Sequence, residues 1–308
     1  MPGCHLVTSA QAHCGPESPE IGLRDQRNDQ SASSISRRGV GTIAVRMTLR
    51  IAIILAAVAI ASVVAPAPAA RLRHAEPMLI YYGGAGSGSL AARAAHLAQG
   101  FRGYALVVFG LAWREPALAA AVRADAGYTR FYGYSDVGSV TMAHVLARLR
   151  LLSRMRFSGV LLDDVGSGLS GNLAQLQHVV DFAHHVGLAV LLNAWDPRQI
   201  LGLHLRRGED AVLCENWVYS DGSWHEPRSA AVFAALRKLQ AQGVRVAMGV
   251  TAKRSPVSPA RIREPVLVTA YTEVGNYVAV SGPYYSAQTD NIFPAGSLKV
   301  ILRAAVFP

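Results

Sequence analysis

Cysteine is scarce in this sequence, which limits what can hold the fold together. The chain contains 3 cysteines in 308 residues. Cys4 and Cys14 lie near the N-terminus, so only Cys214 remains for the rest of the chain. A single thiol cannot form an internal disulfide, so the fold must depend on an apolar core. No cysteine lies beside the alanine- and proline-rich segment 65–70, so no lipoprotein attachment site is marked there.

Charged residues are also few, at 16% of the chain, whereas hydrophobic residues make up 51%. This composition supports a large core and excludes disorder over most of the length. The formal net charge is +10, but nucleic-acid binding would need basic residues clustered among aromatic ones. Many of the basic residues instead lie on expected helices, as at Arg148, Arg150 and Arg206. We therefore expect no nucleic-acid partner.

The sequence has no apolar run as long as a typical membrane span. The stretch 51–65 is shorter than the roughly 20 residues that a span requires. It follows the basic segment 47–50 and precedes a zone of alanine and proline at 65–70, the order found in secretory signal peptides. We expect a signal peptide at 47–70, a linker at 71–77 and a secreted, periplasmic or cell-surface protein. An uncleaved membrane anchor is the alternative.

Residues 1–46 show no apolar periodicity and are rich in serine, glutamine, arginine and glycine. We expect this stretch to be disordered, or to be an upstream extension of the reading frame, with Met47 as the true start.

From residue 78 onward, short apolar runs alternate with longer amphipathic segments. The expected strands are 78–82, 104–109, 128–134, 159–163, 188–193, 211–215, 244–249 and 276–281. The expected helices are 90–99, 116–124, 140–155, 173–186, a segment from about 197, 230–242 and 259–272. Glycine precedes many of the strands, as is typical of a helix end in an αβ loop. Eight such units predict one α/β domain, a (β/α)8 TIM barrel over 78–308, with an open doubly wound sheet as the alternative.

Acidic residues close two of these strands. Asp163 and Asp164 follow the apolar run 159–162, and Glu215 follows 211–214. A carboxylate at the end of a buried strand is costly to desolvate and adds nothing to the core, so a function is favoured. Because the active site of a TIM barrel lies at the carboxyl ends of its strands, these acids are candidates for acid/base or glycosidic chemistry.

Aromatic and polar side chains accompany the acids at the same ends. Aromatic faces stack on sugar rings, while carboxylates and amides bind hydroxyl or amino groups. The candidate substrate-binding residues are Tyr82, Tyr134, Asp136, Asp164, Asn193, Trp195, Trp217 and Tyr219. All four tryptophans follow strand ends, although loop aromatics can also simply cap a barrel. The acidic residues favour a neutral or cationic substrate, while Asp196 is better explained as a helix cap before Pro197.

Three weaker signals point to other chemistry. The glycine-rich segment 83–88 resembles a nucleotide loop, but no acid ends the second strand as a dinucleotide fold requires. His144, His178, His184 and His185 fall on expected helices, away from the strand ends that supply metal ligands. Ser220, Asp221 and His225 are close in sequence, which does not make a catalytic triad. We expect no cofactor and no metal.

The strands ending in Asp163-Asp164, Asn193 and Glu215-Asn216-Trp217, in that order, resemble the spherulin-4-like and endo-α-1,4-polygalactosaminidase glycosidases. The resemblance spans most of 78–286 and rests on short motifs. It implies that Asp163 and Glu215 are the catalytic carboxylates and that the substrate is an α-1,4-linked, galactosamine-containing exopolysaccharide. Asp164 stands where the family often has asparagine, and Asn193-Ala194-Trp195 replaces an Asn-Pro-Gly motif of part of the family.

We therefore expect a secreted retaining glycoside hydrolase, with Asp163 as nucleophile and Glu215 as acid/base. Asp164 either forms a hydrogen bond at the top of the barrel or raises a neighbour's pKa. The polysaccharide is the expected partner, and the membrane is one only through the N-terminal segment. A non-catalytic carbohydrate-binding barrel is the alternative function. A lyase or isomerase acting on phosphorylated sugars is more remote and rests on Lys253 and Arg254 after the seventh strand.

Overall fold

The structure is a computed structural model, and it describes most of the chain from residue 75 onward. The described residues are 75–83, 86–110, 112, 114–127, 129–194, 196–215, 219–220, 222–224, 229–253, 257–271, 275–282 and 292–304. The expected extension 1–46, signal segment 47–70 and most of the linker lie outside these ranges. Among the described residues, no helix has the length and apolar character needed to cross a membrane.

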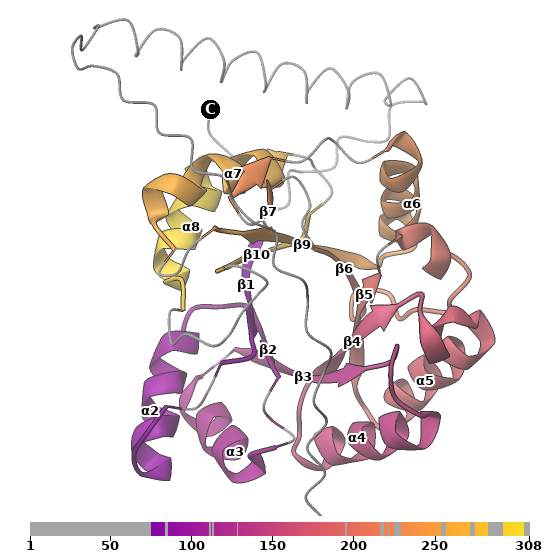
Figure 1. Cartoon of the computed structure of the whole chain (residues 1–308), viewed down its shortest axis with the longest axis horizontal. Helices are drawn as coiled ribbons and strands as arrows, with labels where there is room; N and C mark the ends of the chain where they lie inside the picture. The colour runs from indigo at the N-terminus through magenta and orange to yellow at the C-terminus, as the bar shows by residue number, and fades with distance from the viewer. Residues whose placement is uncertain are drawn as a thin grey trace, which may run out of the picture. The chain divides into compact units, whose positions relative to one another are not determined.

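Parallel strands form a closed ring in the order β1-β10-β9-β6-β5-β4-β3-β2, with helices packed outside it (Figure 1). The strands of the ring are β1 (Glu76–Tyr81), β2 (Leu106–Phe109), β3 (Arg130–Asp136), β4 (Gly159–Val165), β5 (Ala189–Ala194), β6 (Ala211–Cys214), β9 (Arg245–Thr251) and β10 (Tyr277–Ser281). The helices are α2 (Leu90–Phe101), α3 (Pro116–Asp125), α4 (Met142–Arg154), α5 (Leu173–His185), α6 (Ala230–Ala241), α7 (Pro259–Tyr271) and α8 (Ala295–Ala304). The chain therefore folds as a (β/α)8 barrel, and the doubly wound alternative is wrong.

Several element bounds differ from those expected. The segment from Pro197 forms only the 3-10 turn η2 (Pro197–Ile200), in place of a full helix after β5. Another 3-10 turn, η1 (Gly168–Gly171), precedes α5. β1 begins at Glu76, so the end of the expected linker belongs to the barrel. A small antiparallel hairpin of β7 (Tyr219–Ser220) and β8 (Ser223–Trp224) was not expected, and neither was α8.

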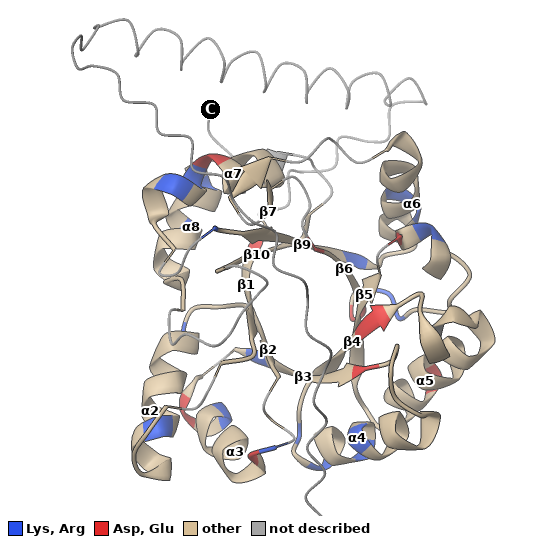
Figure 2. Cartoon of the chain, viewed as in Figure 1, with Lys and Arg blue, Asp and Glu red and all other residues tan. Residues whose placement is uncertain are grey.

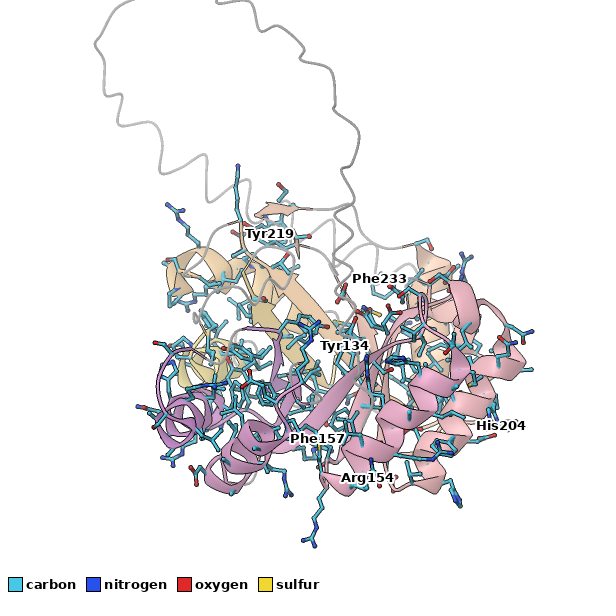
Figure 3. The ribbon with its side chains drawn as sticks, turned by 60° about the horizontal axis from the view of Figure 1, so that its bottom comes forward. Tyr134, Arg154, Phe157, His204, Tyr219 and Phe233 are labelled. Atoms are coloured by element: carbon cyan, nitrogen blue, oxygen red, sulfur yellow. The ribbon has the colours of Figure 1, made fainter. Side chains whose placement is uncertain are left out.

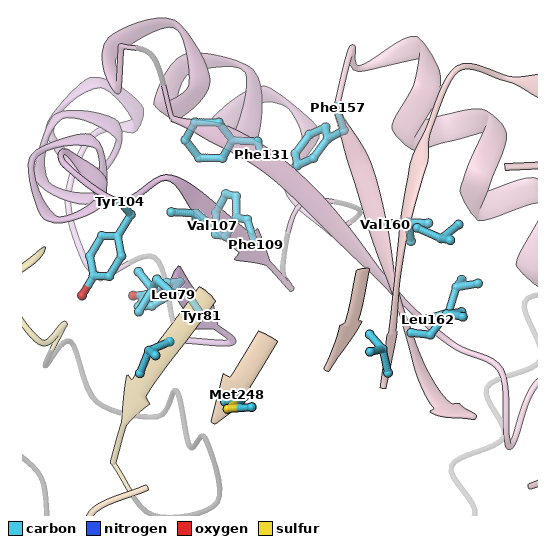
Figure 4. Packing of buried hydrophobic residues seen from close by; sticks show 14 of the residues in the cluster. Leu79, Tyr81, Tyr104, Val107, Phe109, Phe131, Phe157, Val160, Leu162 and Met248 are labelled. Atoms are coloured by element: carbon cyan, nitrogen blue, oxygen red, sulfur yellow. The ribbon is translucent and has the colours of Figure 1, made fainter. Parts of the chain in front are cut away.

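The strands alternate side chains between two apolar cores, as the period of two requires. Outward side chains pack against the helices, as in the group of Leu79, Phe109, Phe131 and Leu162 (Figure 4). Inward side chains fill the barrel. The buried inward residues are Met78, Ile80, Leu106, Val108, Tyr132, Leu161, Leu191, Ala211, Leu213, Ala247, Tyr277 and Ala279. The interior is thus a packed core, and function is left to the strand ends.

The amino-terminal end of the barrel is closed by polar contacts that tie elements together. The fully buried carboxylate of Asp210 accepts hydrogen bonds from the backbone amides of Val190 (2.9 Å) and Arg206 (2.6 Å). The ring nitrogen His184 Nε2 lies 2.9 Å from Oδ2 of the same carboxylate. These bonds join β5, α5 and the start of β6, which is the stabilising end of a TIM barrel.

Glycines end several helices as the sequence pattern predicts. Gly103, Gly127, Gly187 and Gly243 all have positive φ after a helix. Gly159 does not. A Cβ there would lie 2.6 Å from the Ala189 carbonyl oxygen and from the Tyr132 ring, so this glycine is required by close packing inside the barrel.

Candidate active site

Five candidate residues continue the inward series at the carboxyl ends of the strands. Tyr82 follows Ile80, Tyr134 follows Tyr132, Asp163 follows Leu161, Asn193 follows Leu191 and Glu215 follows Leu213, each two positions further along. Side chains two apart lie on the same face of a strand. The alternation that fills the core therefore brings all five to one end of the barrel interior.

Acidic residues mark this end of the ring. Figure 2 shows acidic residues at the ends of β3 and β4, while many of the Lys and Arg residues lie on the surrounding helices. The acids therefore give the strand ends a local negative charge inside a chain of net positive charge.

The Asp163 carboxylate is held by three hydrogen-bond donors. Oδ1 accepts from Asn193 Nδ2 at 2.6 Å and from the backbone amide of Asp164 at 3.0 Å. Oδ2 accepts from the Tyr134 hydroxyl at 2.9 Å. The donors come from β3, β4 and β5, so the carboxylate is fixed in orientation by three neighbouring strands.

Glu215 has an unusual proton affinity for a glutamate. Burial is the largest cause and acts with the negative charges of Asp163 and Asp164, against a hydrogen bond with Asn193, to raise its pKa to about 7. Glu215 can therefore carry a proton near neutral pH and donate it, as a general acid must. The Asn193 amide contacts both carboxyl groups, so it links Asp163 and Glu215 across β4, β5 and β6.

Asp164 occupies a backbone position that few residues tolerate. Its φ is +57°, in the left-handed region, and the register between β4 and β5 shifts between Leu162 and Val165. Aspartate and asparagine are the residues other than glycine that most readily adopt this conformation. The bulge ends the alternation of the strand, and it turns the Asp164 amide toward Asp163. The charge of Asp164 acts on Glu215 and Tyr134.

Tyr134 is fixed by a second tyrosine. The Tyr82 and Tyr134 rings meet edge to face, with centroids 5.3 Å apart and an interplanar angle of 85°. Gly110 leaves room for this pair, because a Cβ at that position would lie 2.3 Å from Tyr82 Cδ1. Burial raises the pKa of the Tyr134 phenol, and the charge of Asp163 raises it further, so the phenol stays protonated and remains a donor. Figure 3 shows Tyr134 among the strands.

Asp136 organises the loop after β3. Its carboxylate accepts from the backbone amides of Gly138 (2.7 Å) and Ser139 (3.0 Å) and from the Ser139 hydroxyl. Burial alone would raise the pKa of Asp136, but these hydrogen bonds outweigh it and lower the pKa. The loop then packs against the one after β4: a Cβ at Gly168 would lie 1.7 Å from the Gly138 carbonyl oxygen.

The remaining sequence candidates are placed as follows. Trp195 and Trp217 lie outside the described residues, as do Trp113 and Asp221.

Tyr219 packs edge to face on Trp224 of the hairpin, with ring centroids 5.2 Å apart. The hairpin is anchored at the end of β9, where the Thr251 hydroxyl lies 3.2 Å from that of Ser220. In Figure 3 Tyr219 lies beyond the ring of strands. The Asp196 side chain accepts a hydrogen bond from the Arg198 amide at the start of η2, which confirms that Asp196 is a cap.

Sequence reasoning missed the glycines that allow these contacts, namely Gly110, Gly138 and Gly168. In the sequence, such a glycine differs from other residues only by its missing side chain. Its role in letting another group lie close to the backbone is recognised only once the neighbouring atoms are known. Among the residues that the structure describes, no group of three or more His, Cys, Asp or Glu side chains is arranged to hold a metal ion.

The sequence matches no protein-family model and no curated protein. Solved structures that are similar in fold include a Rubisco-like protein from Rhodopseudomonas palustris, at 15% identity and a TM-score of 0.46, covering 83% of this chain and 71% of that one. A GH113 β-1,4-mannanase matches at 8% identity and a TM-score of 0.48, covering 76% and 99%. The endo-β-1,4-glucanase of Xanthomonas axonopodis pv. citri matches at 11% and 0.45, covering 76% and 100%. We therefore argue the function from the site itself.

Proposed function

We propose that this protein is a glycoside hydrolase in which Asp163 and Glu215 carry the reaction. The observation that supports it is the unequal environment of the two carboxyl groups. Asp163 is oriented by three donors, while Glu215 lies partly buried near it with a pKa raised to about 7. A carboxylate fixed in orientation beside a carboxylic acid with a raised pKa is the arrangement that glycosidic hydrolysis uses.

In the proposed reaction Asp163 attacks the anomeric carbon while the glycosidic C–O bond breaks. Glu215 gives its proton to the departing oxygen and becomes a carboxylate. That carboxylate then removes a proton from water, the water oxygen attacks the anomeric carbon, and the bond to Asp163 breaks. Glu215 ends the cycle protonated, so a pKa near neutrality suits both of its roles.

A retaining outcome is supported by the link through Asn193. Retaining enzymes hold their carboxyl groups about 5–5.5 Å apart, whereas inverting enzymes leave about 6.5–9.5 Å for a water molecule. A single amide that hydrogen-bonds to both carboxyl groups favours the shorter range.

The proposed substrate is an amino-sugar polysaccharide of the α-1,4-galactosamine type. The resemblance of the strand-end motifs suggests it. The charge of the site agrees with it, because Asp163 and Asp164 favour a cationic sugar such as deacetylated galactosamine. Action outside the cytoplasm is part of the same proposal, since it rests on the signal-like segment at 47–70.

A binding barrel without catalysis is the second candidate. The two are separated by measuring reducing ends released from deacetylated α-1,4-galactosamine polymer, together with polymer binding, for wild type, Asp163→Asn and Glu215→Gln. We expect both variants to lose hydrolysis and to keep binding. Hydrolysis at the wild-type rate by either variant would refute the assignment. Binding by the wild-type protein without any hydrolysis of this polymer or related glycans would favour the second candidate.

A further inference from the structure

The two oxygens of Asp163 are not equivalent. A carboxylate oxygen has two lone-pair directions in the carboxyl plane. On Oδ1 both are occupied, by Asn193 Nδ2 at 2.6 Å and by the Asp164 amide at 3.0 Å. Among the described residues, Oδ2 receives one hydrogen bond, from the Tyr134 hydroxyl at 2.9 Å, which leaves its second lone pair for another contact.

We propose that Oδ2 is the atom of Asp163 that attacks the anomeric carbon, and that Tyr134 is the positioning residue that aims it. This inference rests on the proposed glycosidase function and deepens it. Attack from Oδ1 would require breaking a hydrogen bond from Asn193 or from the backbone. Attack from Oδ2 uses a lone pair that the site leaves available.

The electron count of the step fits these contacts. The Oδ2 lone pair forms the new bond to the anomeric carbon, the electrons of the glycosidic bond pass to the departing oxygen, and that oxygen takes the proton of Glu215. Oδ1 then becomes the carbonyl oxygen of the ester and keeps both of its donors. When water displaces the ester, negative charge returns to Asp163, and the same donors together with Tyr134 receive it.

Tyr134 suits this role because its position is determined from several sides. The Tyr82 ring packs against its edge, and the absent side chain of Gly110 allows Tyr82 to lie there. Asp136 on its own strand and Asp163 and Asp164 on β4 raise the pKa of the phenol. Arg148 of α4 also interacts electrostatically with Tyr134. The phenol therefore remains a donor throughout the working range of Glu215.

The test compares Tyr134→Phe with the matched control Tyr132→Phe on galactosamine polymer. Tyr132 lies on the same strand and the same inward face, two residues earlier and deeper in the core. We expect Tyr134→Phe to lower kcat by about 100-fold, the cost of a misplaced reacting group. KM should change by less than about twofold, since a group that positions the nucleophile contributes little to ground-state binding. Tyr132→Phe should keep the wild-type kcat and KM.

A structural measurement keeps the proposal testable if Tyr134→Phe is unstable. A 5-fluoro galactosaminyl fluoride should trap the glycosyl-enzyme of the wild-type protein for crystallography. We expect the sugar on Oδ2 of Asp163, with Asn193 still bonded to Oδ1. A sugar bonded to Oδ1, or a Tyr134→Phe variant with wild-type kcat, would overturn the inference. If Asp163→Asn is inactive in those same assays, the proposed function survives that failure; if Asp163→Asn is fully active, the proposed function itself fails.

Discussion

Glu215→Gln should make the protein more stable at alkaline pH while removing its activity. The folded protein holds a group whose pKa is raised from 4.5 to about 7, chiefly by burial. Protonated Glu215 fits this environment, and ionised Glu215 does not. The contribution of Glu215 to the free energy of unfolding is fully present below its unfolded-state pKa, near 4.5. This contribution is lost as the pH rises through the folded-state pKa, near 7.

The size of the effect follows from the shift. A difference of roughly 2.5 pKa units corresponds to about 3 kcal/mol at 1.36 kcal/mol per unit. For a barrel of this size, 1 kcal/mol moves Tm by roughly 2–4 °C, so the expected gain is about 6–12 °C. Glutamine has the shape of glutamate and stays neutral at every pH, so it avoids the cost of a buried charge.

The assay is thermal unfolding by circular dichroism at pH 4.5 and pH 8.5. The difference in Tm between Glu215→Gln and wild type should be small at pH 4.5 and reach its full value at pH 8.5. Glu209→Gln is the control, because Glu209 is an exposed glutamate that forms a surface ion pair with Arg206. An equal difference at both pH values, or no gain at pH 8.5, would contradict the raised pKa and with it the role of Glu215 as acid.

The remaining predictions concern the frame of the site. Gly168→Ala should lower Tm and activity together, because its Cβ would lie 1.7 Å from the Gly138 carbonyl oxygen and its φ is positive; wild-type values for both would contradict the loop packing. Asp210→Ala should destabilise the fold by about 3 kcal/mol in chemical unfolding, as expected for breaking a buried pair, with kcat unchanged in the folded fraction. A stable Asp210→Ala protein with a lowered kcat would contradict a purely structural role for Asp210 and would indicate a role in catalysis.

The barrel and its functional end were predictable because they follow from local pattern. Alternation along each strand decides which side chains face inward, so the last inward position of β4, β5 and β6 could be read as Asp163, Asn193 and Glu215. Glycine after helices located many of the αβ loops. These signals need no knowledge of which strands are neighbours.

The contacts that give the site its chemistry were not predictable in the same way. The left-handed conformation of Asp164 depends on a register shift against β5, and the bond from Tyr134 to Asp163 depends on β3 lying beside β4. The hairpin of Tyr219 to Trp224 has strands of two residues, too short for any period. Asp196 and Pro197 mark a helix start after β5, but only the turn Pro197–Ile200 forms, and this capping signal does not set the length of the element.

The stereochemistry of the first product tests the central claim most directly. Proton NMR, recorded during the first minutes of cleavage of an α-1,4-galactosamine oligomer, distinguishes the α anomer from the β anomer before mutarotation. Attack by Asp163 with proton transfer by Glu215 predicts the α product first, and none from Asp163→Asn. Initial release of the β product, or cleavage by Asp163→Asn at the wild-type rate, would contradict the account.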